Sequence, residues 1–266
     1  MPKVSVVISV YNGETYLKEC IDSILNQTYR DFEFIVLNNG STDHTPKILD
    51  RYTDPRLQII HQGNLGISRS LNRGINLSQG DLIVRLDADD LSLPNRLERQ
   101  VAFMDQNPNV VLCGSRFQEM LGDKISSQKV PFIEKDATIR KTLSCFNPFA
   151  HSTIIFRKKT FLEAGGYNDR FKYSQDYDLW MRMLKQGHAG MLKDELSIIR
   201  LTQHSFSNQY NRKQKLEGLL IRWSAFREFG GSPVKTLCYS LKTLAGLIFP
   251  LDSIRQRKFA GRLRGR

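Results

Sequence analysis

The sequence predicts an α/β fold in which a mostly parallel β-sheet is flanked by helices. Apolar, β-branched runs that are typical of buried strands alternate with segments whose apolar residues recur every three or four positions. Polar residues directly follow several of these runs, as expected at the carboxyl ends of parallel strands, where ligands bind. The chain has 266 residues, which is enough for one substantial core and a short appendage.

The alternation is clearest in the first half of the chain. Residues 3–10 form an apolar run that ends in a turn, and residues 17–27 carry one apolar stripe at helical spacing. Because this pattern repeats, we expect Tyr11, Asn38 and Asp87 to follow three strands of one sheet and to line one crevice. The predicted strands are residues 3–10, 32–37, 57–60 and 81–87, and the predicted helices are residues 17–27, 43–52 and 65–77.

An acidic stretch, Asp87-Ala88-Asp89-Asp90, follows the apolar run of residues 82–84. Two carboxylates separated by one residue can approach a hard divalent cation and leave its other positions to water and phosphate oxygens. We therefore expect a Mg²⁺ or Mn²⁺ site for a diphosphate at Asp87 and Asp89. The alternative is that the pair forms an Asx-turn or caps the helix that follows Pro94.

Six segments in a fixed order resemble the family 2 glycosyltransferases. The family has the GT-A fold of nucleotide-diphospho-sugar transferases, a Rossmann-like, mostly parallel sheet flanked by helices. The resemblance runs from about residue 3 to about residue 208, and it implies a catalytic domain at residues 1–208 and a helical basic extension at residues 209–266. The six segments are residues 4–12, 23–29, 39–43, 71–75, 85–90 and 175–180.

This resemblance implies a nucleotide-sugar site at Ser9, Tyr11, Asn38, Asp87 and Asp89, with Tyr11 stacking on the base. The position of Asn38 usually carries an aspartate that accepts a hydrogen bond from the base. An amide also accepts through its oxygen, but it carries no charge, which leaves the identity of the nucleotide open. In the alternative reading, Tyr11 packs on the sheet edge and Asn38 serves only the turn.

The resemblance also implies a metal site. Asp89 is expected to coordinate the cation, Asp87 to contact the ribose or the metal's surroundings, and Asp90 to orient the loop. His204, after the expected last core strand at residues 198–204, is a further candidate metal ligand. A divalent cation beside both phosphates would stabilise the charge that grows on the departing nucleoside diphosphate.

Asp176 is the candidate general base. It stands in the first turn, or at the cap, of a helix predicted to end near Gly187, where the helix dipole should keep its carboxylate ionised. One base suffices for a transfer that inverts the anomeric centre, because it only removes the acceptor hydroxyl's proton. Asp176 could instead be a plain N-cap. The family often has glutamate at the position of Gln175, and Asp178 should face away from Asp176.

The acceptor side is expected to begin with residues 146–156, which by resemblance form the floor of the sugar-binding cleft. His151 lies in this segment, where we expect a hydrogen-bonded structural histidine rather than a catalytic one. A helix is predicted at residues 158–164, with Gly165 and Gly166 as its C-cap and turn.

The carboxyl-terminal extension is strongly basic. From Ser205 onwards the chain has thirteen Lys and Arg against three acidic residues, which accounts for most of the net charge of +12. Residues 216–229 predict an amphipathic helix, and the apolar segment 237–251 is shorter than the ~20 residues that span a bilayer. We expect the extension to lie on an anionic membrane surface. The alternative is a helical cap packed on the catalytic domain.

The sequence therefore predicts an inverting, metal-dependent glycosyltransferase that transfers a sugar from a nucleotide donor, expected to be a UDP-sugar, to a saccharide or lipid-linked saccharide. The implied pathway is cell-surface polysaccharide synthesis, in the cytoplasm or on the cytoplasmic face of the inner membrane. The alternatives are a polyprenyl-phosphate sugar synthase and a non-catalytic sugar-nucleotide-binding protein. The sequence has no nucleic-acid recognition module, no paired cysteine motif and no signal peptide pattern, so we expect no nucleic-acid partner and a reducing compartment.

Overall fold

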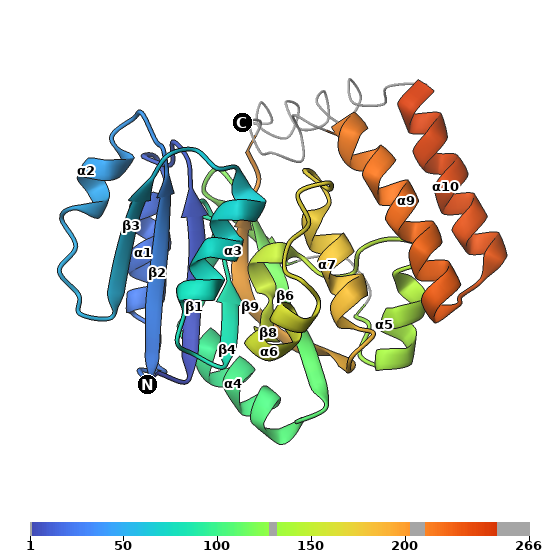
Figure 1. Cartoon of the computed structure of the whole chain (residues 1–266), viewed down its shortest axis with the longest axis horizontal. Helices are drawn as coiled ribbons and strands as arrows, with labels where there is room; N and C mark the ends of the chain where they lie inside the picture. The colour runs from blue at the N-terminus through green and yellow to red at the C-terminus, as the bar shows by residue number, and fades with distance from the viewer. Residues whose placement is uncertain (1, 128–131, 203–210, 249–266) are drawn as a thin grey trace.

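The computed structural model describes residues 2–127, 132–202 and 211–248. In these residues nine strands form one sheet in the order β3-β2-β1-β4-β8-β6-β9-β5, with β7 paired to β6 (Figure 1). The strands are β1 Val4–Val10, β2 Phe32–Asn39, β3 Leu57–Gln62, β4 Leu82–Arg85, β5 Leu91–Ser92, β6 Val110–Leu121, β7 Lys124–Ser127, β8 Ile155–Arg157 and β9 His188–Arg200. The helices are α1 Leu17–Leu25, α2 Thr45–Leu49, α3 Ile67–Leu77, α4 Arg96–Gln106, α5 Asp136–Thr142, the short 3₁₀ turn His151–Thr153, α6 Lys158–Glu163, α7 Gln175–Met183, α9 Asn211–Phe229 and α10 Pro233–Ile248.

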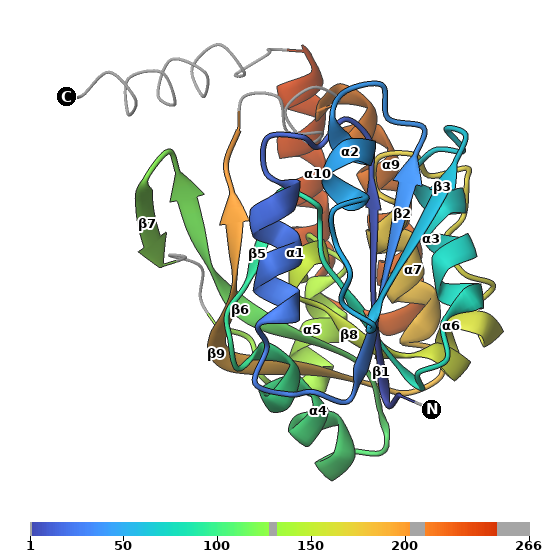
Figure 2. The ribbon, with the colours of Figure 1, turned by 90° about the vertical axis from the view of Figure 1, so that its left-hand side faces the viewer.

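Strands β3, β2, β1 and β4 pair in parallel, as the sequence predicts. Strands β1 and β4 and most of β2 are buried because both faces of this part of the sheet are covered, whereas the edge strand β3 is only partly buried. Along β1, Val6 and Ile8 pack in one core cluster with Leu17 of α1, and Val7 packs in the other with Leu71 of α3. Figure 2 shows α1 and α4 on one side of these strands and α3 and α6 on the other.

The second half of the sheet is mixed. Strand β8 runs antiparallel to β4 and β6, and β9 runs parallel to β6 and antiparallel to β5. The expected last strand at residues 198–204 is wrong at both ends, because β9 begins at His188 and ends at Arg200. Strand β9 pairs with β6 through a ladder that contains register shifts. The sequence of β9 is partly polar and therefore lacks the simple apolar pattern of a buried strand.

Several predicted helices are shorter in the structure. Helix α1 ends at Leu25, α2 covers only Thr45–Leu49, and α7 ends at Met183. Helix α6 ends as predicted, since Gly165 and Gly166 follow it with φ angles of +80° and +67°. This left-handed backbone is the conformation that favours glycine at a helix end.

Helices α9 and α10 form a hairpin, and α9 contacts α5 and α7 (Figure 1). Ile221 and Ala225 of α9 are buried in the same core cluster as Trp180 of α7. Leu220 on the same helix is 66% exposed. The expectation of one apolar face is therefore wrong, because apolar residues lie on both an inner and an outer side of α9. Within the described ranges, no helix is both long enough and apolar enough to cross a membrane.

Candidate functional site

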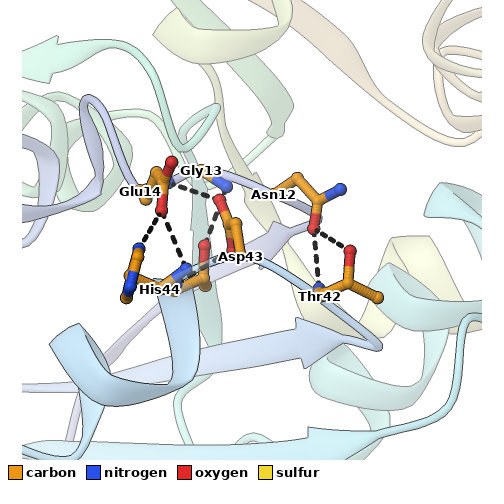
Figure 3. A network of polar contacts seen from close by, with 7 residues as sticks. Asn12, Gly13, Glu14, Thr42, Asp43 and His44 are labelled. Carbon is orange, nitrogen blue, oxygen red and sulfur yellow. Dashed lines mark hydrogen bonds and ion pairs between the residues drawn. The ribbon is translucent and has the colours of Figure 1, made fainter.

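The loops that follow β1 and β2 are bound to each other at the carboxyl edge of the sheet (Figure 3). The Asn12 side-chain oxygen accepts the Thr42 N–H at 2.8 Å, and Asp43 accepts the Glu14 N–H at 3.0 Å. Glu14 in turn accepts the His44 N–H at 2.8 Å. These reciprocal contacts hold the two loops as one rim, although they belong to separate strand–helix units.

Tyr11 and Ser9 lie beside this rim. Tyr11 is 53% exposed, so its ring is accessible to a flat ligand such as a nucleobase. Ser9 is half-buried near the end of β1, where it pairs in register with Leu37 of β2. The structure therefore places Ser9 near the carboxyl end of β1 and Tyr11 directly after it, as the sequence predicts.

Asn38 is buried, and its amide is used within the protein. Its oxygen accepts the Ser41 N–H at 3.1 Å, and its nitrogen lies 2.9 Å from Nδ1 of His61. These are the contacts of a residue that holds a turn. The amide oxygen retains a second lone pair, but the amide nitrogen is directed at His61.

Asp87 follows β4 and is held by two neighbours. It forms an ion pair with the buried guanidinium of Arg85, and its carboxylate accepts the Ser152 hydroxyl at 3.0 Å. Burial acts to raise the pKa of Asp87, but the Arg85 charge and the Ser152 hydrogen bond outweigh it and hold this pKa below its ordinary value. Asp87 therefore stays ionised.

Asp89 differs from Asp87, because no described side chain donates a hydrogen bond to its carboxylate. Burial, and next the negative charge of Asp87, raise the pKa of Asp89 to about 6. A bound cation would relieve this electrostatic penalty, and carboxylate oxygens are the ligands that Mg²⁺ and Mn²⁺ prefer. Asp87 and Asp89 thus have the chemistry of a partial metal site. Among the described residues, no group of three His, Cys, Asp or Glu side chains could hold a metal, and His204 lies outside them.

Arg200 fixes the acidic turn and was missed by the sequence reasoning. Its Nε donates to the Asp89 carbonyl at 2.9 Å, and its backbone N–H donates to the buried Asp90 carboxylate at 2.8 Å. Its guanidinium also pairs with Glu19 at 2.7 Å and lies over the Tyr16 ring of the α1 region. No local pattern indicates this role, because Arg200 lies more than a hundred residues from the turn that it holds.

Asp176 lies in the first turn of α7, where the sequence predicts it, and accepts the Asn147 amide at 2.9 Å. Backbone N–H groups at the helix terminus do lower its pKa, but burial is the larger effect and raises the pKa of Asp176 to about 6. Burial therefore outweighs the helix terminus in setting this pKa. A carboxylate with a pKa near 6 is a stronger base than an ordinary aspartate and is still largely ionised at neutral pH.

The segment from Asn147 to Ser152 contacts both groups of carboxylates. Asn147 binds Asp176, and Ser152 binds Asp87. Asp176 is close enough to Asp87 for the Asp87 charge to contribute to its raised pKa. The structure thus brings together carboxylates from β4 and α7 that are far apart in the sequence.

His151 and Asp178 both have structural partners. Nε2 of His151 lies 2.7 Å from the Tyr167 hydroxyl, and burial together with the nearby Arg85 charge lowers the pKa of His151 to about 3. His151 is therefore neutral. Asp178 is buried and forms an ion pair with Arg182 at 2.7 Å, which turns it away from Asp176.

Comparison with known proteins agrees with this arrangement. The sequence profile described as "Glycosyl transferase family 2" matches residues 5–165. An O-antigen biosynthesis glycosyltransferase, WbnJ of Escherichia coli, is 40% identical over 69% of this chain and 72% of its own length. An amylovoran biosynthesis glycosyltransferase, AmsE of Erwinia amylovora, is 32% identical over 92% of this chain and 94% of its own length.

Solved structures share the fold at lower sequence identity. TarS of S. aureus in complex with UDP-GlcNAc superposes with a TM-score of 0.70 and 19% identity, over 93% of this chain and 73% of that chain. The TarS structure with UDP is matched over 65% of its length. The mannosyltransferase PcManGT from Pyrobaculum calidifontis, in complex with GDP-Man and Mn²⁺, superposes with a TM-score of 0.67 and 18% identity, over 99% of this chain and 81% of that chain. The family profile matches more than half of the residues of this chain, and AmsE is more than 30% identical over nearly the full length of both proteins. This chain therefore belongs to glycosyltransferase family 2 and has the GT-A fold.

Proposed function

We propose that this glycosyltransferase is an inverting, metal-dependent enzyme that transfers a sugar from a nucleotide-sugar donor to a saccharide or lipid-linked saccharide. The observation that carries the proposal is that one short segment binds both groups of carboxylates, since Asn147 donates to Asp176 and Ser152 donates to Asp87. We infer that these side chains line one cleft, with a donor end at Asp87 and Asp89 and an acceptor end at Asp176. One end is suited to a diphosphate with its cation, and the other to proton removal.

The donor end of the proposal rests on Tyr11, Asp87 and Asp89. The exposed Tyr11 ring would stack on the base, and Asp87, kept ionised by Arg85, would accept a hydrogen bond from the ribose. TarS was solved with UDP-GlcNAc and PcManGT with GDP-Man, so related folds accept both uracil and guanine nucleotides. We favour a UDP-sugar. The engagement of Asn38 by Ser41 and His61 makes Tyr11 the larger contributor to base binding.

The metal proposed here is Mn²⁺ or Mg²⁺, with Asp89 as the main protein ligand, Asp87 beside it and His204 as a further candidate. Mn²⁺ in the PcManGT complex supports a divalent cation in this fold. When bound, such a cation would stabilise the negative charge of the diphosphate leaving group. Arg200 would keep the Asp89–Asp90 turn in place by holding its backbone.

Asp176 would act as the general base. The acceptor oxygen forms a bond to the anomeric carbon as the bond from that carbon to the diphosphate oxygen breaks, and the hydroxyl proton moves to the Asp176 carboxylate. Attack opposite the leaving group inverts the anomeric centre. Asn147 would orient the carboxylate through its hydrogen bond to Oδ2, leaving Oδ1 to accept the proton.

The relatives suggest a pathway. WbnJ and AmsE are described as O-antigen and amylovoran biosynthesis glycosyltransferases, so we place this enzyme in cell-surface polysaccharide synthesis, on the cytoplasmic face of the membrane. In this arrangement residues 1–208 are the catalytic domain and residues 209–266 are an extension, whose helices α9 and α10 form the described part.

The proposed membrane contact is the outer face of the α9–α10 hairpin. A groove of about 460 Å³ lies between the two helices, and Leu220, Leu241 and Leu244 at its lining are exposed. Arg227 also lines it, and the chain that follows is rich in Arg and Lys, which suits anionic lipid headgroups.

The membrane contact is tested by sedimentation of the full chain with phosphatidylglycerol-containing vesicles. We expect the double variant Leu220→Glu, Leu241→Glu to reduce bound protein at least tenfold, because it puts two charges where apolar area would enter the interface. The control is Leu162→Glu, at an exposed leucine on α6. Removing the whole hairpin would not serve, because Ile221 and Ala225 belong to the core. Equal sedimentation of wild type and double variant would refute the contact.

The transferase proposal is tested by measuring release of nucleoside diphosphate from a panel of UDP-, GDP-, TDP- and CDP-sugars, with Mn²⁺ and membrane lipid extract as acceptor source. We expect turnover with one donor class, loss of turnover on metal chelation, and inversion of the anomeric centre in the product. Binding of a donor without turnover under any condition would instead favour a non-catalytic binding protein. Turnover with polyprenyl phosphate that survives Asp176→Asn would favour a polyprenyl-phosphate sugar synthase.

A further inference from the structure

Helix α9 reaches the acceptor side of the cleft through Glu217. The Glu217 carboxylate accepts three consecutive backbone N–H groups, from Lys172 at 3.0 Å, Tyr173 at 2.8 Å and Ser174 at 2.9 Å. These residues form the last stretch of loop before α7, which carries Asp176 in its first turn. One side chain of the extension therefore holds the backbone that leads into the proposed base.

The start of α7 depends on the Glu217 contact because the helix has no side-chain N-cap hydrogen bond of its own. Ser174 is the N-cap residue of α7, yet its side chain makes no capping hydrogen bond to its own helix. Its hydroxyl donates instead to the Gln214 carbonyl of α9 at 3.2 Å. Four hydrogen bonds to α9 thus fix the residues that enter α7, and three of them are charge-assisted, which makes them stronger than neutral ones.

Helix α9 is itself a firm support. Ile221, one turn after Glu217, is buried in the core cluster, and Ala225 follows it one turn later. Arg222 donates to the Thr243 hydroxyl of α10 at 3.1 Å, which ties the second helix of the hairpin to the first. Glu217 is therefore carried on a packed helix, and its position is not set by the loop that it binds.

We propose that Glu217 is a positioning residue for the general base: by anchoring the backbone of residues 172–174 to α9, it sets the position of Asp176 in the cleft. The inference rests on the proposed role of Asp176. It also means that the basic extension, in which Glu217 stands among cationic neighbours, contributes to the active site as well as to any membrane contact. Asn147 would then fix the base through its carboxylate, and Glu217 would fix it through the backbone of the three residues that lead into α7.

The same helix provides a matched control. Glu228 also connects α9 to the α7 region, through an ion pair with Lys185 at 2.7 Å beyond the end of α7. Both partners are well exposed, and such pairs contribute little. Glu228→Gln removes the same charge from the same helix without touching the loop before Asp176, so it separates positioning from the general effect of charge.

The experiment compares Glu217→Ala, Glu217→Gln and Glu228→Gln in the full chain. Amide hydrogen exchange of residues 172–174 is measured first, because it does not depend on activity. Initial rates then give kcat and the donor KM, and calorimetry gives the Kd of the nucleoside diphosphate with Mn²⁺. We expect Glu217→Ala to speed exchange at these amides at least tenfold and to lower kcat at least tenfold, since displacing a catalytic group by about 1 Å can cost as much as a hundredfold.

The donor KM and the nucleotide Kd should stay within twofold of wild type, because Glu217 makes no contact with the residues of the donor end. Glu217→Gln should recover part of kcat, since its amide oxygen still accepts hydrogen bonds, and Glu228→Gln should match wild type throughout. Unchanged exchange or unchanged kcat in Glu217→Ala would overturn the inference, as would equal losses of kcat and nucleotide binding, which indicate general destabilisation. If wild type itself transfers no sugar, the proposed function fails, while the exchange result still decides whether Glu217 holds the loop.

Discussion

The two ends of the proposed cleft are built differently, although each contains an aspartate whose pKa is raised to about 6, chiefly by burial. At the donor end, Asp89 stands on a short turn directly after β4, close to Asp87 and Arg85 in the sequence. At the acceptor end, Asp176 is held by Asn147, 29 residues before it, and the loop leading to it is held by Glu217, more than forty residues after it.

This difference shows two ways in which a fold can raise the pKa of an aspartate. The pKa of Asp89 is raised first by burial and next by the neighbouring Asp87 charge, so a bound cation or a proton relieves the Asp89 carboxylate. Asp176 is destabilised chiefly by lost hydration and keeps only a few hydrogen bonds, so it gains from accepting a proton. The first environment suits a metal ligand and the second suits a base, and the two should respond differently to the same Asp→Asn change.

The largest expected effect is at the acceptor end. Asp176→Asn removes the proton acceptor while its side-chain oxygen can still bind Asn147, so kcat should fall about 10³-fold, within the usual range for general bases. Nucleotide binding should be unchanged. Initial rates of donor turnover with acceptor present, with calorimetric Kd values, measure both. A variant that retains more than a tenth of wild-type kcat would break the assignment.

At the donor end, Asp89→Asn should lower kcat about 10²-fold, comparable to removing one preorganised contact to developing charge. The loss should depend on Mn²⁺ concentration, because the variant binds the cation more weakly. The control is Asp105→Asn, which removes the same charge at an exposed ion pair with Lys3. Rates measured over a manganese titration distinguish a weakened metal site from a general loss of folding.

The pH dependence of kcat should report the ionisation of Asp176 alone. Asp176 must be ionised to accept a proton, so kcat should level off above about pH 7 and fall tenfold per pH unit well below the Asp176 pKa of about 6. Donor saturation and excess Mn²⁺ keep the donor end occupied during the measurement. If kcat instead begins to fall only near pH 4, the ordinary pKa range of an aspartate, Asp176 is hydrated in the working enzyme.

The same shift has a smaller consequence for stability. The folded pKa of Asp176 is raised above its ordinary value, so ionisation at neutral pH destabilises the fold, and the penalty disappears as pH falls through about 6 towards 4. Asp176→Asn should therefore increase the free energy of unfolding by about 2 kcal/mol at pH 7.5, discounted for partial solvent contact, and by little at pH 4. Urea denaturation at the two pH values checks this.

The smallest effect is expected at Asn38. In Asn38→Asp, a carboxylate oxygen can still accept the Ser41 N–H, and the other oxygen can accept a hydrogen bond from the His61 ring N–H. The turn should therefore persist. If this residue serves mainly the turn, the ranking of UDP, GDP, TDP and CDP affinities should not change. A gain of UDP selectivity in calorimetry would show instead that residue 38 contacts the base.

The donor end could be predicted from sequence because its geometry is local. The apolar run of β4 and the aspartates that follow it are adjacent in the chain, and parallel strands place Tyr11, Asn38 and Asp87 at one edge. Asp176 was found through the resemblance of its segment to the family, and its position in the first turn of α7 is confirmed. The sequence could not predict that burial would outweigh the helix dipole, because burial depends on packing by distant segments.

The residues that sequence reasoning missed all act across long separations. Arg200 holds the turn at Asp89 from the end of β9, and Glu217 holds the loop before Asp176 from a helix that was read only as basic and amphipathic. Neither has a local pattern that marks it. The irregular second half of the sheet was missed for a related reason, since strand β9 gains its order from β6 rather than from its own periodicity.

The most direct test of the central claim is calorimetric binding of UDP, GDP, TDP and CDP with and without Mn²⁺, to wild type, Asp89→Asn and Asp176→Asn. We predict selective, manganese-dependent binding of one nucleotide to wild type and Asp176→Asn, and loss of the manganese dependence in Asp89→Asn. Binding to Asp89→Asn that matches wild type, or no binding of any nucleotide to wild type, would contradict the division of the cleft into a metal-bound donor end and a separate base.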